Sequence, residues 1–248
     1  MTDWISAEVK KVIKWNNSLF TLIINAPISL FIAGQFTKLS LKINNKSIQR
    51  AYSYVNAPNN KNLEFYLVLI KNGIFSPYLY QMKKGDKIFI SKHAKGSFII
   101  NNIPHCDNLW MLSTGTAIGP YLSILQDKKN MDRFKKIILV HAVRYYEDLS
   151  YLSLMKKIEQ QYKNKLHIKI VTSREKINNT LFGRIPELIK NKKLENAIQL
   201  PIDNTNSHVM ICGNPQMVYD TKKVLEHEKN MIINLKNRLG HITTERYW

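Results

Sequence analysis

The hydrophobic residues of this 248-residue chain follow two different periods, and the change between them near residue 109 limits what it can fold into. Before that point, apolar and polar residues alternate in short runs, as in residues 39–43 and 63–69. A period of two is typical of strands with one buried face. Turns rich in Asn, Gly and Pro separate these runs, so the first part predicts a small antiparallel barrel with one helix near residues 77–82.

Beyond residue 109, continuous apolar runs alternate with helical patterns. Strands are expected at residues 109–112, 136–143, 166–172 and 209–212. Helices are expected through Leu125, over Leu149, Leu152, Met155 and Ile158, near residues 185–194, and over residues 215–227. This alternation predicts β-α-β units and a parallel sheet. The predicted fold class is therefore β plus α/β, with an antiparallel barrel over residues 1–101 and a parallel-sheet α/β domain over residues 102–248.

Composition excludes several classes of protein. Hydrophobic residues make up 44% of the chain, which is enough for a sizeable core and argues against disorder. The first fifteen residues include Asp3 and Glu8 and no continuous apolar segment, so no secretory signal is predicted. No apolar run approaches the ~20 residues that span a bilayer. The chain has only two cysteines and no predicted secretory signal, so we expect a cytoplasmic protein. Its histidines are scattered and it has no C-x-x-C or H-E-x-x-H motif, so we expect no metal site.

The chain is strongly basic, with 37 Lys and Arg against 18 Asp and Glu, a formal net charge of +19. Such a charge favours an acidic partner. Compositional drift toward Lys, Asn and Ile explains it equally well, and both interpretations stay open. No dense basic block is present; the nearest is Lys83, Lys84, Lys87, Lys92 and Lys95.

The loops that follow the predicted parallel strands are the places where ligands bind in such sheets. Residues 113–120 are mostly small, so backbone N–H groups there can approach a phosphate, although an ordinary tight turn has the same composition. Arg144, Arg174 and Arg184 follow successive strands. Arginines at neighbouring strand ends favour a phosphorylated ribose, and hence NADP over NAD; the alternative is three surface cations.

Three other segments combine residues suited to a flat, phosphorylated ligand. Residues 50–53 place an arginine, a tyrosine and a serine close together, as an edge strand of a barrel also could. Cys212 lacks a motif-fixed acid or histidine, so a small buried residue is favoured over a nucleophile, and Gly213 beside it lets a ring lie near the backbone. Tyr247 and Trp248 end the chain and should stack on the protein surface or on a cofactor.

These segments, taken in order, resemble those of the bacterial ferredoxin/flavodoxin-NADP reductases. The resemblance rests on Arg50-Ala51-Tyr52-Ser53, on residues 114–120, on Cys212-Gly213-Asn214-Pro215 and on Tyr247-Trp248, and it covers essentially the whole chain. It implies an FAD-binding antiparallel barrel followed by an NADP-binding α/β domain, whose C-terminal aromatic tail returns to the flavin.

The resemblance also implies a role for individual residues. Arg50 would hold the FAD pyrophosphate, Tyr52 would pack on the isoalloxazine, and the Ser53 hydroxyl would lie near flavin N5. The other positions implied for FAD are Ala51, Tyr66, Leu67, Val68, Leu69, Ile74, Phe75, Ser76, Thr116, Tyr247 and Trp248. Those implied for NADP are Val143, Arg144, Ser173, Arg174, Arg184, Asn214, Pro215 and Gln216. Cys212 would lie close to the nicotinamide, so the implied catalytic set is Ser53, Cys212 and Tyr247, acting as positioning groups.

The expected function is hydride transfer from NADPH to FAD N5 and then single-electron transfer to flavodoxin or ferredoxin. No nucleic-acid or membrane partner is expected, and the chain is expected to be a monomer. Two alternatives stay open: an NAD(P)H-dependent reductase of free flavin or another acceptor, and a basic nucleic-acid-binding barrel.

Overall fold

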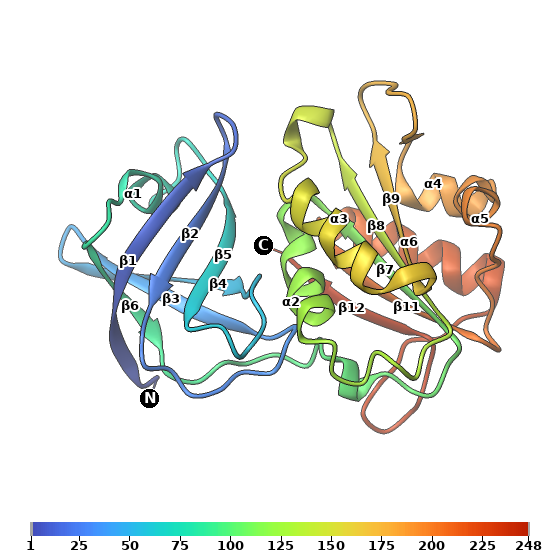
Figure 1. The fold of residues 1–248 in the computed structure, drawn as a ribbon, viewed down its shortest axis with the longest axis horizontal. Coiled ribbons are helices and arrows are strands. Elements are labelled where there is room, and N and C mark those ends of the chain that lie inside the picture. Colours follow the sequence, from blue (N-terminus) through green and yellow to red (C-terminus); the bar gives the residue numbers. More distant parts are fainter. Residues whose placement is uncertain (1, 248) are drawn as a thin grey trace. The chain divides into compact units, whose positions relative to one another are not determined.

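A computed structural model describes residues 2–247, which form two compact units (Figure 1). The chain passes from the first unit to the second between Ile99 and Ile100, but the segment Gly119–Lys128 belongs to the first. This segment contains helix α2 (Gly119–Asp127). Within that unit, Ser123 Oγ donates a 2.7 Å hydrogen bond to the Asn56 carbonyl, and Gln126 Nε2 donates one of 2.8 Å to the Val55 carbonyl.

The first unit is a curled antiparallel sheet of six strands, in the order β4-β3-β6-β1-β2-β5. The strands are β1 (Trp4–Lys14), β2 (Leu19–Asn25), β3 (Phe36–Ile43), β4 (Lys46–Ser53), β5 (Asn62–Val68) and β6 (Lys87–Ser91). A β-bridge between Tyr54 and Phe65, and a 2.9 Å bond from Val55 N to Glu64 O, bring the two edge strands together. The predicted antiparallel barrel is therefore confirmed, and the one predicted helix is α1 (Ser76–Gln81).

The core of this unit comes from the inward residues of all its strands, among them Phe20, Leu39 and Phe65, each fully buried. The alternation predicted from the sequence is incomplete. Tyr66 was expected on the polar face but is 5% exposed, and Ser40 is buried with its Oγ 3.0 Å from Ser47 Oγ.

The second unit is a parallel sheet of six strands with helices around it, in the order β10-β9-β8-β7-β11-β12. The strands are β7 (Asn108–Thr114), β8 (Lys136–Val143), β9 (Leu166–Thr172), β10 (Leu181–Phe182), β11 (Ser207–Gly213) and β12 (Ile242–Arg246). The helices are α3 (Leu152–Gln161), α4 (Ile185–Lys190), α5 (Lys193–Ile198) and α6 (Pro215–Lys229). The predicted α/β class is confirmed, and β8 and β9 have the predicted bounds.

Two predicted helices were wrong in extent. The segment 185–194 is not one helix: α4 ends before Asn191, because Lys192 has a left-handed φ of 59° that a continuous helix cannot include. Leu149 lies outside α3, because Tyr151 has a φ of 61° and the helix begins after it. Both helices are interrupted by a residue with a positive φ, which the spacing of hydrophobic residues does not predict.

Candidate functional site

The carboxyl ends of the parallel strands carry two of the predicted arginines, and backbone hydrogen bonds join their loops. Arg144 directly follows β8, and Arg174 lies two residues after the end of β9. Ser173 N donates to Val143 O, and Arg174 N donates to Arg144 O, each at 3.0 Å. These bonds continue the β8–β9 ladder past the end of the sheet and place the two arginines on adjacent loops.

The third predicted arginine lies beside the next strand. Strand β10 pairs in parallel with β9, and Gly183 N donates a 3.0 Å bond to Thr172 O. Arg184 follows as the N-cap residue of α4. All three arginines are exposed, and none takes part in an ion pair within residues 2–247. Exposed guanidinium groups without a carboxylate partner are suited to binding an anionic ligand.

The end of β11 is fixed against the end of β7. Gly213 has a φ of 144°, and an ideal Cβ at this residue would lie 2.1 Å from Thr114 Oγ1. The same oxygen accepts a 3.1 Å hydrogen bond from Asn214 N. Asn214 Oδ1 in turn accepts bonds from Gln216 N (2.9 Å) and Met217 N (3.3 Å), and so caps α6. The predicted segment 212–216 is therefore a tight strand-to-helix turn.

Cys212 is fully buried at the same strand end. Its Sγ lies 3.9 Å from Glu245 Oε1, in the register pair that joins β11 to β12. Burial, and then the nearby Glu245 carboxylate, raise the pKa of the Cys212 thiol well above its usual value. The thiol therefore stays protonated. A nucleophilic cysteine needs the thiolate form, whereas a residue that only positions a ligand does not. Glu245 was not predicted from the sequence, because β12 has no strong apolar pattern.

The C-terminal tail continues past β12 along the end of β11. Tyr247 is half-buried, and its backbone N donates a 3.0 Å bond to the Gly213 carbonyl. Tyr247 therefore lies at the turn that includes Gly213 and Asn214. Trp248 lies outside the described residues.

A buried histidine supports the predicted small-residue loop. Nε2 of His141, on β8, lies 3.0 Å from the Gly115 carbonyl, and the ring is fully buried. Burial lowers the pKa of His141 to about 4, so the ring is neutral at pH 7. A carbonyl only accepts, so Nε2 carries the hydrogen and donates it. This bond holds the loop that includes the buried Thr116. No motif in the sequence predicts a contact between His141 and this loop.

In the first unit, the segment 50–53 ends strand β4. Arg50 is exposed, with Nη1 donating a 2.7 Å bond to the Gln49 carbonyl, whereas Ser53 is 7% exposed. The Tyr52 ring lies nearly parallel to that of Phe75, at 15° and with 6.3 Å between ring centroids. Burial raises the pKa of Tyr52 to about 12, and the positive charge of Arg50 opposes this only in part. The hydroxyl is therefore neutral at pH 7.

The remaining first-unit residues predicted to contact FAD lie on β4, on β5 with the loop after it, and at the start of α1. Ala51 is exposed, Tyr66 and Leu67 are buried, Val68 and Leu69 are half-buried, Ile74 is exposed, and Phe75 and Ser76 are buried. Ser76 Oγ accepts a 2.9 Å bond from Ile70 N, and Leu69 N donates to Ser18 O at 2.6 Å. These bonds fix the loop between β5 and α1. Thr116 and Tyr247 belong to the second unit.

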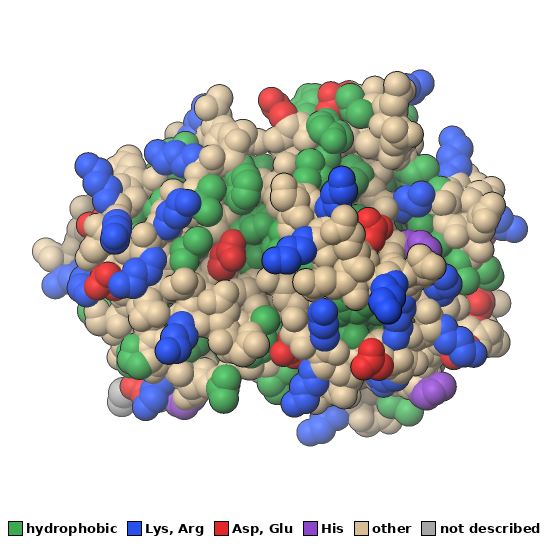
Figure 2. Space-filling view, viewed as in Figure 1, with side chains coloured by type: hydrophobic (Ala, Val, Ile, Leu, Met, Phe, Trp, Pro, Cys, Tyr) green, Lys and Arg blue, Asp and Glu red, His purple; other side chains and the backbone are tan. Residues whose placement is uncertain are grey.

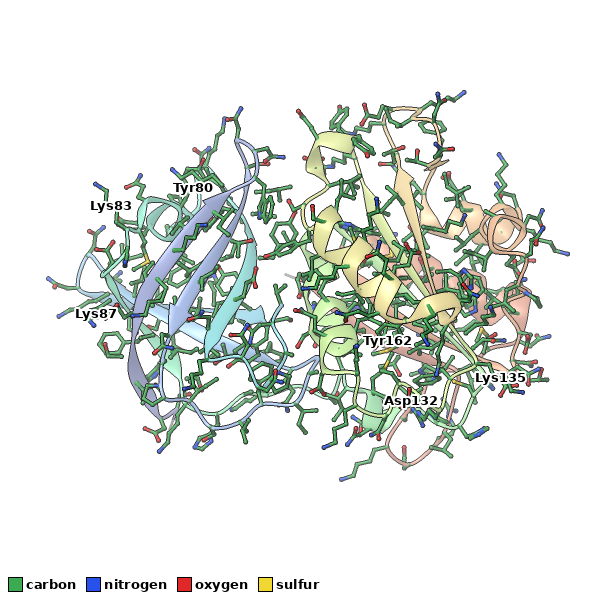
Figure 3. All side chains as sticks on the ribbon, viewed as in Figure 1. Tyr80, Lys83, Lys87, Asp132, Lys135 and Tyr162 are labelled. Atoms are coloured by element: carbon green, nitrogen blue, oxygen red, sulfur yellow. The ribbon has the colours of Figure 1, made fainter. Side chains whose placement is uncertain are left out.

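Basic side chains are spread over both units, as Figure 2 shows. Lys83 and Lys87 belong to the first unit and Lys135 to the second (Figure 3). Lys87 pairs with Glu8 at 3.3 Å and Lys135 with Asp107 at 2.9 Å. The ion pairs of the described residues include those of Lys10, Lys87, Lys92, Lys135, Lys222 and Lys229, a small part of the 37 basic residues. The described residues contain neither a cluster that could hold a metal ion nor a helix long and apolar enough to cross a membrane.

Two family models match the two parts of the chain. Residues 5–99 match the oxidoreductase FAD-binding domain, and residues 111–223 match the oxidoreductase NAD-binding domain. A solved structure described as a ferredoxin NADP+ reductase from Neisseria gonorrhoeae, with bound FAD and NADP, has a TM-score of 0.93 and 32% identity. It covers 99% of both chains.

Curated relatives match along their whole length. The chain is 52% identical over 248 residues to the flavodoxin/ferredoxin–NADP reductase of Escherichia coli (strain K12), with 100% of both chains covered. It is 53% identical over 257 residues to the protein of the same name from Buchnera aphidicola subsp. Schizaphis graminum, again with 100% of each covered. The resemblance found in the sequence is thereby confirmed. The chain belongs to the flavodoxin/ferredoxin–NADP reductase family of FAD-dependent oxidoreductases.

Proposed function

We propose that this enzyme transfers electrons between NADPH and flavodoxin or ferredoxin, with FAD held by the first unit and NADPH at the carboxyl edge of the second unit's sheet. The observation that carries the proposal is the placement of Arg144, Arg174 and Arg184 at neighbouring strand ends, exposed and outside any ion pair of the described residues. The full-length similarity to reductases does not favour the nucleic-acid-binding alternative.

The residues of the first unit fit FAD. Arg50 presents a guanidinium group at the surface for a pyrophosphate, and the parallel Tyr52 and Phe75 rings offer apolar faces for a flat ring system. When bound, FAD accepts a hydride at N5 and releases the electrons singly, which is chemistry the protein does not supply. The proposed FAD residues are Arg50, Ala51, Tyr52, Ser53, Tyr66, Leu67, Val68, Leu69, Ile74, Phe75, Ser76, Thr116, Tyr247 and Trp248.

The second unit fits NADP. Arg144, Arg174 and Arg184 would bind the 2′-phosphate, and the turn at Gly213 leaves backbone that a Cβ would otherwise cover. Helix α6 starts directly after Asn214, whose side chain already caps it. The proposed NADP residues are Val143, Arg144, Ser173, Arg174, Arg184, Asn214, Pro215 and Gln216.

Ser53, Cys212 and Tyr247 are proposed as the groups that orient the reacting rings. Hydride transfer depends on close alignment more than on acid or base groups. A protonated, buried Cys212 fits such a role, because it adds no charge beside a nicotinamide. Tyr247 would cover the flavin until the nicotinamide takes its place.

The finer features of the protein are part of the same proposal. We divide the chain into an FAD-binding domain at residues 1–101 and an NADP-binding domain at residues 102–248, acting as a cytoplasmic monomer. The excess of unpaired lysine and arginine would steer an acidic carrier toward the enzyme.

Flavin spectra and reduction by nucleotide test the proposal. The purified protein should bind FAD, with the flavin absorbance bands, and NADPH should bleach those bands under anaerobic conditions much faster than NADH. If bound FAD is absent even after reconstitution, or if both nucleotides reduce it equally, the proposal is wrong. Release of the flavin during turnover, with free FMN as the better acceptor, would favour the free-flavin alternative.

A further inference from the structure

Two loops at the carboxyl edge of the second unit's sheet carry Arg144 and Arg174. The loop after β8 begins at Arg144, and the loop after β9 begins at Ser173. The backbone bonds from Ser173 N to Val143 O and from Arg174 N to Arg144 O join them at their bases. Beyond Arg174 this ladder of backbone hydrogen bonds ends, and a side chain makes the next contact between the two loops.

That contact comes from a carboxylate. Glu175 Oε1 accepts a hydrogen bond from the backbone N of Tyr146, across the two loops. On its own side, the Glu175 carbonyl accepts a 2.8 Å bond from Oγ1 of Thr172, which is fully buried at the end of β9. Glu175 is thus anchored to the strand end and reaches the neighbouring loop.

The residue next to it makes a parallel contact. The Arg174 guanidinium lies over the ring of Tyr145, with 5.9 Å between the guanidinium carbon and the ring centroid. Consecutive residues of one loop, Arg174 and Glu175, therefore contact consecutive residues of the other, Tyr145 and Tyr146. The pairs hold the two loops in one register.

A carboxylate directly after Arg174 in the chain is unexpected in a proposed site for phosphate. By charge alone, Glu175 repels an anion and weakens its binding. Yet Glu175 forms no ion pair with Arg144, Arg174 or Arg184; its carboxylate is directed to the Tyr146 amide. Its geometry suits a structural link between loops, not neutralisation of the arginines.

We propose that Glu175 is a positioning residue for the 2′-phosphate of NADP(H). By binding Tyr146 N, it holds the loop after β8 against the loop after β9, so that Arg144 and Arg174 are preorganised for one phosphate. The inference rests on the proposed function, in which these arginines bind that phosphate. In this proposal Glu175 contributes to selectivity for a phosphorylated ribose without contacting the phosphate.

Two substitutions separate positioning from charge. Glu175→Gln removes the negative charge but keeps a side-chain oxygen that can accept the Tyr146 bond. Glu175→Ala removes both. If charge dominated, both variants would bind the phosphate more tightly; if positioning dominates, Glu175→Ala alone weakens binding. Glu187→Ala, which removes an exposed acid from the first turn of α4, is the matched control.

The experiment uses the FAD-loaded enzyme. Calorimetry measures the affinity for adenosine 2′,5′-bisphosphate and for 5′-AMP, and steady-state kinetics give KM and kcat with NADPH and NADH. For Glu175→Ala we expect the Kd for the bisphosphate and the KM for NADPH to rise about tenfold. We expect kcat, the 5′-AMP affinity and NADH kinetics to change less than about twofold. Glu175→Gln and Glu187→Ala should stay within that range for all ligands.

Other results overturn the inference. Unchanged or tighter bisphosphate binding by Glu175→Ala contradicts a positioning role, as does an equal loss for NADPH and NADH. A loss in Glu175→Gln as large as in Glu175→Ala would also contradict it, because glutamine keeps an oxygen that can accept the Tyr146 bond. The proposed function fails separately: in that case Arg174→Ala, measured alongside, leaves bisphosphate binding unchanged.

Discussion

Oγ1 of Thr114, at the end of β7, lies where a side chain on Gly213, at the end of β11, would have to be. An ideal Cβ on Gly213 would be 2.1 Å from that oxygen, far inside van der Waals contact. The oxygen also accepts the 3.1 Å bond from Asn214 N, so moving it would break the turn. The close approach of the ends of β7 and β11 therefore requires glycine at position 213.

Gly213→Ala should destabilise the protein and weaken NADPH binding. A φ of 144° is strained for alanine, and the clash with Thr114 adds to this strain; together we expect a loss of about 2–4 kcal/mol in unfolding free energy. Gly183→Ala is the control, because Gly183 has a φ of 141° but meets only the Leu188 side chain, at 3.3 Å. Urea unfolding of both variants measures the difference. Equal losses would show that backbone strain alone matters.

Arg174→Ala should weaken use of NADPH and leave use of NADH nearly unchanged. A charge-assisted contact to phosphate is worth roughly 1.5–3 kcal/mol, so KM for NADPH should rise about 10- to 100-fold. Steady-state kinetics with both nucleotides measure it. An equal loss for NADPH and NADH would refute a role at the 2′-phosphate.

His141 should make the protein less stable as the pH falls below about 6.5. Its pKa is 6.5 when unfolded and about 4 when folded, so the unfolded chain binds the proton first and stability is lost between these values. From pH 7 to pH 5 the loss from this residue is about 2 kcal/mol. His141→Gln keeps a donor for the Gly115 carbonyl but cannot titrate, so its stability should depend less on pH. Urea unfolding at both pH values tests this, with the exposed His227→Gln as control; the same change in both variants would contradict it.

Tyr247→Ala should change the flavin fluorescence and the access of nicotinamide to the flavin. The proposed role of the tyrosine ring is to cover the flavin, while its backbone N remains bonded to Gly213 O. Removing the ring should raise the fluorescence of bound FAD and weaken discrimination between NADPH and NADH. Tyr247→Phe, which keeps the ring, should behave as the parent protein. Unchanged spectra and kinetics in Tyr247→Ala would show that the tail only packs on protein.

The features that the sequence predicted well depend on local pattern. Strand β8 is buried on both faces, and its continuous apolar run marked its bounds. Strand β9 is half-buried in its middle, where Ile168 and Ile170 alternate with polar residues, and this pattern also marked a strand. The neighbouring placement of Arg144 and Arg174 followed from parallel topology alone, since the carboxyl ends of parallel strands share one edge. Pattern and topology together were enough to find this edge of the sheet.

The residues missed depend on tertiary pairing. Glu245 reaches Cys212 only because β12 pairs with β11 in a register that no local signal sets. His141 and Glu175 bond to backbone 26 and 29 residues away, at Gly115 and Tyr146, and neither has a motif around it. These hydrogen bonds join segments far apart in the sequence, and the pattern of residues within one segment does not predict them.

NADPH-driven reduction of flavodoxin and ferredoxin, measured side by side by stopped flow at two ionic strengths, tests the proposed electron transfer. We expect rapid reduction of at least one carrier through the bound flavin, slower at high salt and abolished when FAD is removed. Failure to reduce either carrier, by an enzyme whose FAD is nevertheless reduced by NADPH, would contradict it.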